Sequence, residues 1–503
     1  MSSRTFPSAR RVVSLAFLAS LALLGALFVW TAATREYPWV NRDTASGIVN
    51  GLKMASGQRL YVDWLQNNPP SWFQLCHVLT LASRALSLHP VATYHLAVLA
   101  FSLAGFLLLR RALPAREGPD PFPFVVVAHL VVTVLPNLDP YDFGQREQLF
   151  SLLFLPYLFW RLTGGGLSFW VAVYLVALGH FSLMKPGFLA AVVLLEMTLG
   201  LRLRIARWLA LGMALPLTFL AIHSVDSVRG FLGWLVPLHA SGIYDAYGEP
   251  GSVFGRWWMG NGPLAVALPV TLLITSLLAW FLRVHPARHL VCGAAILVLT
   301  AGSIYTQHKF WSYHYAFLYA QLVFFSAFLL HRVLHELVRP ALASLAAAAL
   351  ALTFFGPRLV TQLERFSGEP ESLDHPLASR FRALGAATPV LILSTSIDHE
   401  TSTLLTNVNA VGPWCFNFTV PGMARLDGIG PRHRAFVRYT ESLRRLIARE
   451  KPALVAFSPS RQALPKGVTM HGIFQEEYGL LDGQPYREEP PTRTGWRLYR
   501  RAP

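Results

Sequence analysis

Long apolar segments recur along the first 356 residues of this chain, separated by mostly short polar connections. Each segment has roughly 15–21 residues, close to the length of helix that crosses a hydrocarbon core about 30 Å thick. The pattern therefore predicts an all-α polytopic membrane protein with about eleven transmembrane helices. The predicted spans are residues 13–33, 91–109, 122–136, 147–163, 167–183, 187–201, 208–222, 263–283, 289–305, 313–331 and 340–356.

The first predicted span, residues 13–33, follows a basic N-terminus. It is longer than the apolar region of a cleaved signal peptide, which usually has about 7–15 residues. We therefore expect a retained signal anchor. The small residues at 31–33 leave a cleaved peptide as the alternative.

Arginine is concentrated in alternate connections between the predicted spans. The positive-inside rule assigns such connections to the cytoplasm, so the N-terminus is predicted to be cytoplasmic as well. The arginines concerned are Arg110, Arg111, Arg116, Arg161, Arg202, Arg204, Arg207, Arg283, Arg288, Arg332 and Arg339. The remaining connections are then extracytoplasmic: residues 34–90, 137–146, 184–186, 223–262 and 306–312, and everything after about 357.

The apolar stretch at residues 71–88 breaks this alternation if it crosses the membrane. It contains Gln74, His77 and Arg84, which are costly inside a bilayer. We therefore interpret it as an amphipathic helix that lies in the membrane interface. A twelfth span is the alternative.

The composition agrees with a membrane protein. The chain is 53% hydrophobic and 14% charged, whereas soluble domains have about a quarter charged residues. Its net charge of +16 lies in clusters between apolar segments, not in a stripe with interleaved aromatic residues. We expect membrane lipids and no nucleic acid among its partners. Cys76, Cys292 and Cys415 are far apart and form no CxxC, so no disulfide framework or zinc site is predicted.

Residues 357–503 change in character and predict a small α/β domain outside the membrane. Residues 389–396 and 453–459 are short apolar runs typical of strands. Between them, residues 433–451 alternate apolar and polar positions with helical periodicity.

The first outer loop, residues 34–90, contains most of the candidate chemistry. Asp43 lies about ten residues after the first span, and a helix-like stretch follows it. Further on come Gly57, Tyr61 and Asp63, and then two consecutive prolines at 69–70 before an aromatic-rich segment.

In this order and spacing, the loop resembles that of the GT-C superfamily of membrane glycosyltransferases. The family-39-like branch, which includes protein O-mannosyltransferases and lipid A aminoarabinose transferases, is the nearest. The second outer loop, 138–150, supports the resemblance, because its Gly-Gln-Arg-Glu stretch at 144–147 is similar to one in bacterial members. The resemblance implies a GT-C-like transmembrane domain at 1–356 and an extracytoplasmic domain at 357–503, in a bacterial inner membrane.

The resemblance also implies roles for individual residues. Asp43 would be the catalytic base, and Asp142, or alternatively Asp139, would face it from the second loop, with Mg²⁺ or Mn²⁺ as a possible shared cofactor. Relatives often have lysine immediately before the two prolines, where this chain has the neutral Asn68. The charge on the donor phosphate would then be met by other residues. The predicted donor-binding residues are Asp63, Asn68, Asp142, Arg146, Lys185, His308 and Lys309.

Each of these residues also has an ordinary structural interpretation. Asp43 could be the N-cap of the helix that follows it, and Asp139 could form a turn before Pro140. Arg146 and Glu147 could form a local charge pair, and Lys185 could extend toward water at a helix end. His308 and Lys309 belong to a cluster rich in aromatic residues, which an interfacial aromatic belt would explain.

The function that the resemblance implies is transfer of a sugar from a polyprenyl-phosphate donor to an acceptor hydroxyl at the outer face, with inversion. The acceptor is a glycan, a lipid or a protein. The alternatives are a transporter or flippase for lipid-linked sugars and a non-catalytic assembly protein. Transporters often have internal repeats and midplane charges, whereas here the acidic residues collect in loops. Replacing Asp43 by Asn would separate these classes.

Overall fold

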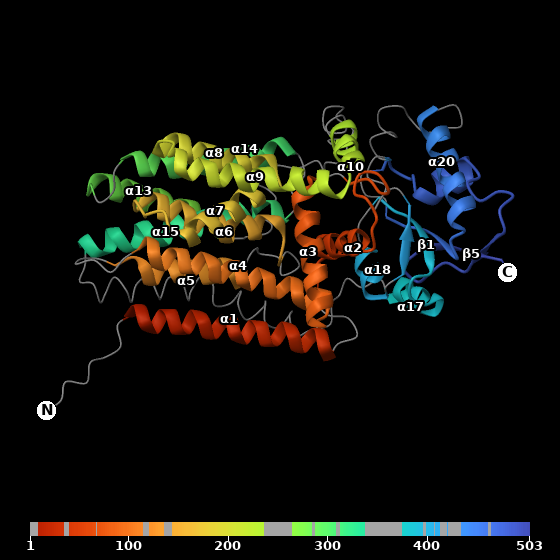
Figure 1. Ribbon diagram of the computed structural model, residues 1–503, viewed down its shortest axis with the longest axis horizontal. Coiled ribbons are helices and arrows are strands. Elements are labelled where there is room, and N and C mark those ends of the chain that lie inside the picture. Colours follow the sequence, from red (N-terminus) through yellow and green to blue (C-terminus); the bar gives the residue numbers. More distant parts are fainter. Residues whose placement is uncertain are drawn as a thin grey trace.

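The computed structural model (Figure 1) has a bundle of helices at one end and a smaller α/β domain at the other. The N-terminal end of α1 lies at the far end of the bundle from the α/β domain. The residues described are 9–34, 40–66, 68–113, 120–134, 143–235, 264–283, 287–307, 312–337, 375–395, 399–406, 408–412, 420, 434–460 and 464–502.

Ten of the eleven predicted spans correspond to helices, and the eleventh, residues 340–356, lies outside the described residues. The ten helices are α1 (Ala9–Thr34), α4 (Pro90–Ala112), α5 (Phe122–Val134), α6 (Arg146–Leu162), α7 (Phe169–Ser182), α8 (Pro186–Leu199), α9 (Leu203–His223), α13 (Leu264–Phe281), α14 (Ala287–Gln307) and α15 (Ala316–Leu337).

Within the described residues, five helices are long and apolar enough to cross a membrane: α1, α4, α9, α14 and α15. Helices α5, α7, α8 and α13 are apolar but shorter, and the predicted count of eleven spans is therefore not confirmed. Large apolar side chains also face outward, since Leu23 of α1 and Met197 of α8 are both 73% exposed. Length, composition and outward apolar surface together identify the bundle as the membrane-embedded part of the chain.

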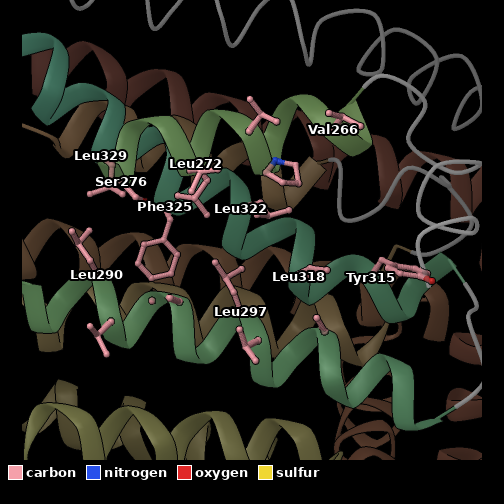
Figure 2. A pocket seen from close by; sticks show the side chains of 18 residues that line it. Val266, Leu272, Ser276, Leu290, Leu297, Tyr315, Leu318, Leu322, Phe325 and Leu329 are labelled. Carbon is pink, nitrogen blue, oxygen red and sulfur yellow. The ribbon is translucent and has the colours of Figure 1, made fainter. Parts of the chain in front are cut away.

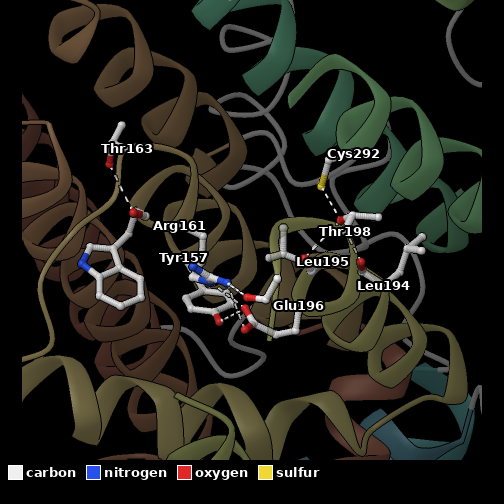
Figure 3. Close-up of polar contacts among 10 residues, drawn as sticks. Tyr157, Arg161, Thr163, Leu194, Leu195, Glu196, Thr198 and Cys292 are labelled. Carbon is white, nitrogen blue, oxygen red and sulfur yellow. Dashed lines mark hydrogen bonds and ion pairs between the residues drawn. The ribbon is translucent and has the colours of Figure 1, made fainter. Parts of the chain in front are cut away.

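Helices α6 and α8 are joined by a buried polar network (Figure 3). Arg161 donates to the Glu196 carboxylate through Nε at 2.7 Å and Nη2 at 3.2 Å, and to the carbonyl of Gly200 at 3.0 Å. The Tyr157 hydroxyl donates to the same carboxylate at 2.5 Å. Because the charges are buried, paired and hydrogen-bonded, they fix the relative position of the two helices.

A shorter helix pair lies at the end of the bundle that faces the α/β domain: α2 (Arg42–Ala55) and α3 (Pro70–Leu86). In Figure 1, α3 runs across the direction of the bundle helices, as expected of the predicted interfacial helix at 71–88. The two helices pack closely because α2 has glycine at two contact positions. A Cβ at Gly47 would lie 2.3 Å from Trp72 Nε1, and one at Gly51 would lie 2.5 Å from the Cys76 carbonyl oxygen.

The remaining short helices are α10 (Val225–Gly230), the π-helix η2 (Phe231–Leu235) and the 3₁₀ turn η4 (Ser312–Tyr315). Helix α10 packs at the end of α9 and touches the first outer loop, since a Cβ at Gly230 would lie 2.3 Å from the Tyr61 carbonyl oxygen. The π-helix η2 packs on the same region, because Phe231 lies with its ring centroid 5.5 Å from that of Tyr61, whereas η4 packs on α6 and α15.

In the described part of the α/β domain, five strands form one sheet in the order β2-β1-β3-β5-β4. Strand β1 is parallel to β2 and β3, while β5 is antiparallel to β3 and β4, with Leu391 opposite Val455 and Val455 opposite Tyr499. The strands are β1 (Pro389–Leu393), β2 (Asn409–Val411), β3 (Leu454–Phe457), β4 (Tyr486–Glu489) and β5 (Arg497–Arg501); the helices are α17 (His375–Leu384), α18 (Glu400–Thr406), α20 (Arg434–Glu450) and the π-helix η5 (Gly472–Glu477).

The sequence predicts β1, β3 and α20 correctly. Helix α20 packs Phe436, Leu443 and Ile447 against one face of the sheet, and α17 covers the other face. The domain meets the bundle through α18, which packs on α2. The boundary predicted near residue 356 lies outside the described residues and stays a prediction.

Candidate functional site

Asp43 lies in the first turn of α2, at the end of the bundle that faces the α/β domain. The N-cap of this helix is Asn41, whose side-chain oxygen accepts a hydrogen bond from the backbone N–H of Thr44 at 2.8 Å. The capping interpretation of Asp43 is therefore wrong. Its carboxylate is half-buried and remains available for other contacts.

Gln145, from the turn before α6, is the hydrogen-bond donor that contacts Asp43. Its Nε2 donates to Asp43 Oδ2 at 2.7 Å and to Asn41 Oδ1 at 3.2 Å. Asn41 in turn donates to the carbonyl of Phe143 at 2.6 Å. These contacts join the segments around residues 41–43 and 143–145, which are about a hundred residues apart in sequence, and they orient the carboxylate.

The turn before α6 depends on Gly144, which has φ +83°. A Cβ there would lie 2.8 Å from the ring of Tyr94, whose hydroxyl donates to the Gly144 carbonyl at 2.7 Å. The Gly144 N–H donates to Gln148 Oε1 at 2.7 Å. Glycine at this position allows both the left-handed turn and the close approach of Tyr94.

Arg146, the first residue of α6, contacts two residues of the segment between α1 and α4. Its Nη1 donates to the side-chain oxygen of Asn68, and its guanidinium carbon lies 4.5 Å from the ring centroid of Trp72. The Tyr61 hydroxyl donates to the Asn68 carbonyl at 2.5 Å and so fixes the backbone there. Stacking and hydrogen bonding together hold the guanidinium in one orientation.

Lys185, the residue before α8, pairs with the Glu147 carboxylate and is only 13% exposed at its side chain. It therefore turns into the protein and does not extend toward water as its ordinary interpretation suggests. Glu147 is 2% exposed and is paired with Lys185, not with Arg146. The local ion pair between Arg146 and Glu147 that the sequence suggested is therefore not formed. Glu147 of α6 forms its ion pair with Lys185, at the start of α8, instead.

Asp43, Arg146, Glu147 and Lys185 act on one another electrostatically, and we call these four residues the charged cluster. Burial raises the pKa of Asp43 above its ordinary value, although the charge of Arg146 and the hydrogen bond from Gln145 oppose the rise. Burial lowers the pKa of Lys185 to about 8, although the charge of Glu147 opposes the fall. Both shifts bring these groups closer to neutral pH, as is common for groups in functional sites.

Three buried atoms in this cluster or beside it have no hydrogen-bond partner among the described residues. They are Gln145 Oε1, Arg146 Nε and Glu147 Oε2. Their residues are 1%, 5% and 2% exposed, so each unpaired atom carries a desolvation cost of about 1–3 kcal/mol. These consecutive groups, at the N-terminal end of α6, are available to hydrogen-bond a polar ligand.

The structure thus brings together Asp43, Asn68, Arg146 and Lys185 from the predicted set. Asp63 lies elsewhere: it pairs with Arg59 at 3.1 Å and accepts the Arg59 backbone N–H at 2.6 Å. These bonds lower the pKa of Asp63. The other candidates, Asp139, Asp142, His308 and Lys309, lie outside the described residues, and their roles stay predictions.

A divalent metal at Asp43 would need further oxygen ligands. Within the described residues no group of three or more His, Cys, Asp or Glu side chains is arranged to hold a metal ion. Among the described residues, Glu147 has a carboxylate close enough to act on Asp43, but one of its oxygens is already paired with Lys185. The described residues alone do not make a metal site, and the prediction of Mg²⁺ or Mn²⁺ at Asp43 and Asp142 depends on residues outside them.

The sequence reasoning missed Gln145 and Glu147 as site residues, as well as Asn41 and Trp72. Residues 144–147 are four polar or glycine residues in a row at the start of an otherwise apolar helix. This pattern was a usable signal for Gln145 and Glu147. The contacts of Asn41 and Trp72 are long-range, and no local pattern reveals them.

An apolar groove of about 910 Å³ lies between α13, α14 and α15 (Figure 2). Its lining includes Leu272, Leu297 and Phe325, and Tyr315 of η4 lies at one end. Two residues after Tyr315, Phe317 packs against Phe150 and Phe188, with ring centroids 5.0 and 5.8 Å away.

These two phenylalanines lie one helical turn beyond the charged cluster. Phe150 follows Arg146 and Glu147 on α6, and Phe188 follows Lys185 at the start of α8. Their rings stack at a centroid distance of 4.3 Å. The Tyr315 end of the apolar groove is therefore linked to the charged cluster through the ring contacts of Phe317 with Phe150 and Phe188.

The chain is thus a helical membrane protein with a buried charged cluster where its bundle meets an α/β domain. No protein-family model matches it, and a search of curated proteins finds no match. Among solved structures it is similar to the Archaeoglobus fulgidus oligosaccharyltransferase, crystallised with Zn and sulfate, at a TM-score of 0.43 and 13% identity. The alignment covers 96% of this chain and 73% of that one. Such a similarity is too low to establish a shared fold.

Proposed function

We propose that this protein is a GT-C-like membrane glycosyltransferase that transfers a sugar from a polyprenyl-phosphate donor to an acceptor hydroxyl at the outer membrane face. The observation that carries the proposal is the convergence of one carboxylate, Asp43, with two cations, Arg146 and Lys185, beside an apolar groove. The substrates of such a transfer have the matching parts. The acceptor has a hydroxyl for the carboxylate, and the lipid-linked donor has an anionic phosphate for the cations and a long apolar chain for the groove.

The roles follow from the chemistry of the transfer. Asp43 takes the proton of the acceptor hydroxyl as its oxygen attacks the anomeric carbon. The bond from that carbon to the phosphate oxygen breaks, and the polyprenyl phosphate leaves with the electron pair. A single displacement of this kind inverts the anomeric centre.

Negative charge grows on the phosphate as it leaves, and fixed cations lower the barrier to that step. Arg146 is suited to this role because Asn68 and Trp72 hold its planar guanidinium in place. Lys185 supplies a second charge, and Glu147 fixes its position. Asn68 thus orients the cation on Arg146 in place of supplying one of its own.

The groove between α13, α14 and α15 is the proposed place for the isoprenoid chain. It is lined almost wholly by apolar side chains, and Phe317, two residues after Tyr315 of the lining, packs on Phe150 and Phe188. The polyprenyl tail would lie among the helices while its phosphate reaches Arg146 and Lys185 at the membrane boundary.

The test is the Asp43→Asn variant of the full chain, reconstituted in phospholipid vesicles with a panel of polyprenyl-phosphate sugars. We expect turnover to fall by about 10²–10⁴-fold while donor binding persists, because only the general base is lost. Glu336→Gln is the control, since Glu336 is an exposed carboxylate near the C-terminal end of α15 that lines neither the groove nor the charged cluster. Unchanged turnover in Asp43→Asn would refute the proposal. It would also be refuted if the wild type bound none of the donors in the panel.

A further inference from the structure

A second polar cavity, of about 720 Å³, lies between the first outer loop and the α/β domain. The loop contributes Gln58, Val62 and Asp63, and the domain contributes β2 with Gly412 and one face of α20. Helix α2 connects this cavity to the charged cluster, because Asp43 lies in its first turn and Gln58 follows its last.

Two acidic and two basic side chains line the cavity, and Arg59, which pairs with one of the acids, adds a third cation beside it. Both acidic groups that line it are already paired: Asp63 with Arg59 at 3.1 Å, and Glu450 with Arg449 at 2.6 Å. Arg445 also lines the cavity, is exposed, and forms no ion pair with any of the residues described. The cavity therefore has a free cation and attracts an anionic group.

The rest of the lining suits a polyol. The amides of Gln58 and Asn409 and the hydroxyl of Ser442 can each donate and accept hydrogen bonds. Asn409 to Gly412 includes the carboxyl end of a parallel strand, the edge at which α/β sheets commonly bind ligands. Small apolar patches at Val62 and Leu446 can pack against the apolar faces of a sugar ring.

The separation between the two sites limits the shape of a shared ligand. From Asp43 to Ala55, α2 rises by about 18 Å at 1.5 Å per residue. A molecule that reaches both Asp43 and the cavity must therefore be extended. Binding energy gained at such a distance can help to hold the reacting end in place.

We propose that this cavity is an acceptor subsite for an extended acidic glycan, one that carries carboxylate or phosphate groups. The proposal rests on the transferase function proposed above and specifies its acceptor class. Arg445 binds the anionic group, and Gln58, Asn409 and Ser442 bind neighbouring hydroxyls.

The test measures binding to the full chain in vesicles of neutral phosphatidylcholine. The probes are an oligogalacturonate, an oligo(glycerol phosphate) and a neutral maltooligosaccharide of similar length. We expect one or both anionic probes to bind and the neutral one to bind far more weakly. Arg445→Gln should weaken anionic binding by about tenfold or more, the usual effect of losing a charged hydrogen bond.

Arg438→Gln is the matched control, because Arg438 is an exposed arginine of the same helix that does not line the cavity. If Arg438→Gln and Arg445→Gln lost the same amount of affinity for the anionic probes, the binding would be due to general surface charge, and the proposal would be overturned. Unchanged binding in Arg445→Gln, or equal binding of the neutral probe, would overturn it too. Asp43→Asn should bind the probes normally, so failure of the subsite and failure of the transferase proposal are distinguishable.

Discussion

Gln145 donates a hydrogen bond to the carboxylate of Asp43 at 2.7 Å, across 102 positions of sequence. The same amide nitrogen contacts Asn41, the N-cap of the helix that carries Asp43. One side chain at the start of α6 therefore sets both the orientation and the charge environment of the proposed base.

This contact predicts the behaviour of a Gln145→Leu variant. Without the hydrogen bond that lowers it, the pKa of Asp43 should rise further, and the acid limb of the activity profile should move to higher pH. Turnover should fall by about tenfold, because a hydrogen bond to a charged group is lost. The measurement is kcat against pH in reconstituted vesicles. Gln74→Leu, which removes a buried amide that donates to Pro216, should leave the acid limb in place.

Arg146→Lys should weaken donor binding although it keeps the positive charge. Lysine lacks the planar fork that contacts Asn68 and stacks on Trp72, so the cation would no longer be held in one orientation. We expect KM for the polyprenyl-phosphate donor to rise by about 10–100-fold. Arg84→Lys, at an exposed arginine of α3, is the control. A donor KM equal to that of the wild type would show that Arg146 does not bind the phosphate.

Activity should have a bell-shaped dependence on pH. Asp43 must be deprotonated to act as a base, and because its pKa is raised, activity is lost as the pH falls through a value above the ordinary aspartate range. Lys185 must be protonated to stabilise the phosphate, so activity is also lost as the pH rises through about 8.

The variant Lys185→Arg separates the two limbs. Arginine stays protonated well above pH 8, so the alkaline limb should move to higher pH while the acid limb stays nearly constant. The measurement is kcat/KM from about pH 5 to 10. An alkaline limb that is identical in wild type and variant would assign it to a group other than Lys185.

Ala294→Trp should obstruct the proposed lipid groove. Ala294 lines the groove and is exposed, so a larger side chain can be accommodated without disturbing the core. We expect KM to rise by about tenfold for a long-chain donor, which corresponds to roughly two buried methylene groups lost. A donor with a short isoprenoid chain should be unaffected. Leu211→Trp, on the outward face of α9, controls for a bulky residue elsewhere on the bundle surface.

Glu196→Gln should destabilise the bundle. The change leaves the buried Arg161 guanidinium without its charged partner, and breaking a buried pair in this way costs about 3–5 kcal/mol. The thermal midpoint in detergent should fall. Replacing Arg161 and Glu196 together by Met should recover much of the loss, because no unpaired charge then remains. A double variant as unstable as Glu196→Gln would contradict this account.

The positions of the bundle helices and of β1, β3 and α20 follow from the sequence because each has a local signature. An apolar run of spanning length predicts a helix wherever it lies in the chain, and a short β-rich run or an amphipathic period is equally local. Strands β4 and β5 were missed: β4, Tyr-Arg-Glu-Glu, and β5, Arg-Leu-Tyr-Arg-Arg, have mostly polar residues. Both are antiparallel additions at one side of the sheet: β5 pairs with β3, and β4 pairs with β5, so their strand character comes from these long-range pairings.

For the charged cluster, too, some features follow from the sequence and others only from the tertiary structure. The sequence by itself predicted that Asp43, Arg146 and Lys185 lie at one end of the bundle, because the alternation of arginine assigns a side to each connection. Only the tertiary structure decided that Gln145 orients Asp43, that Glu147 binds Lys185 and not its neighbour Arg146, and that Asp63 faces a different cavity. Those choices depend on how α2, α6 and α8 pack, and packing between segments about a hundred residues apart leaves no periodic trace in either one.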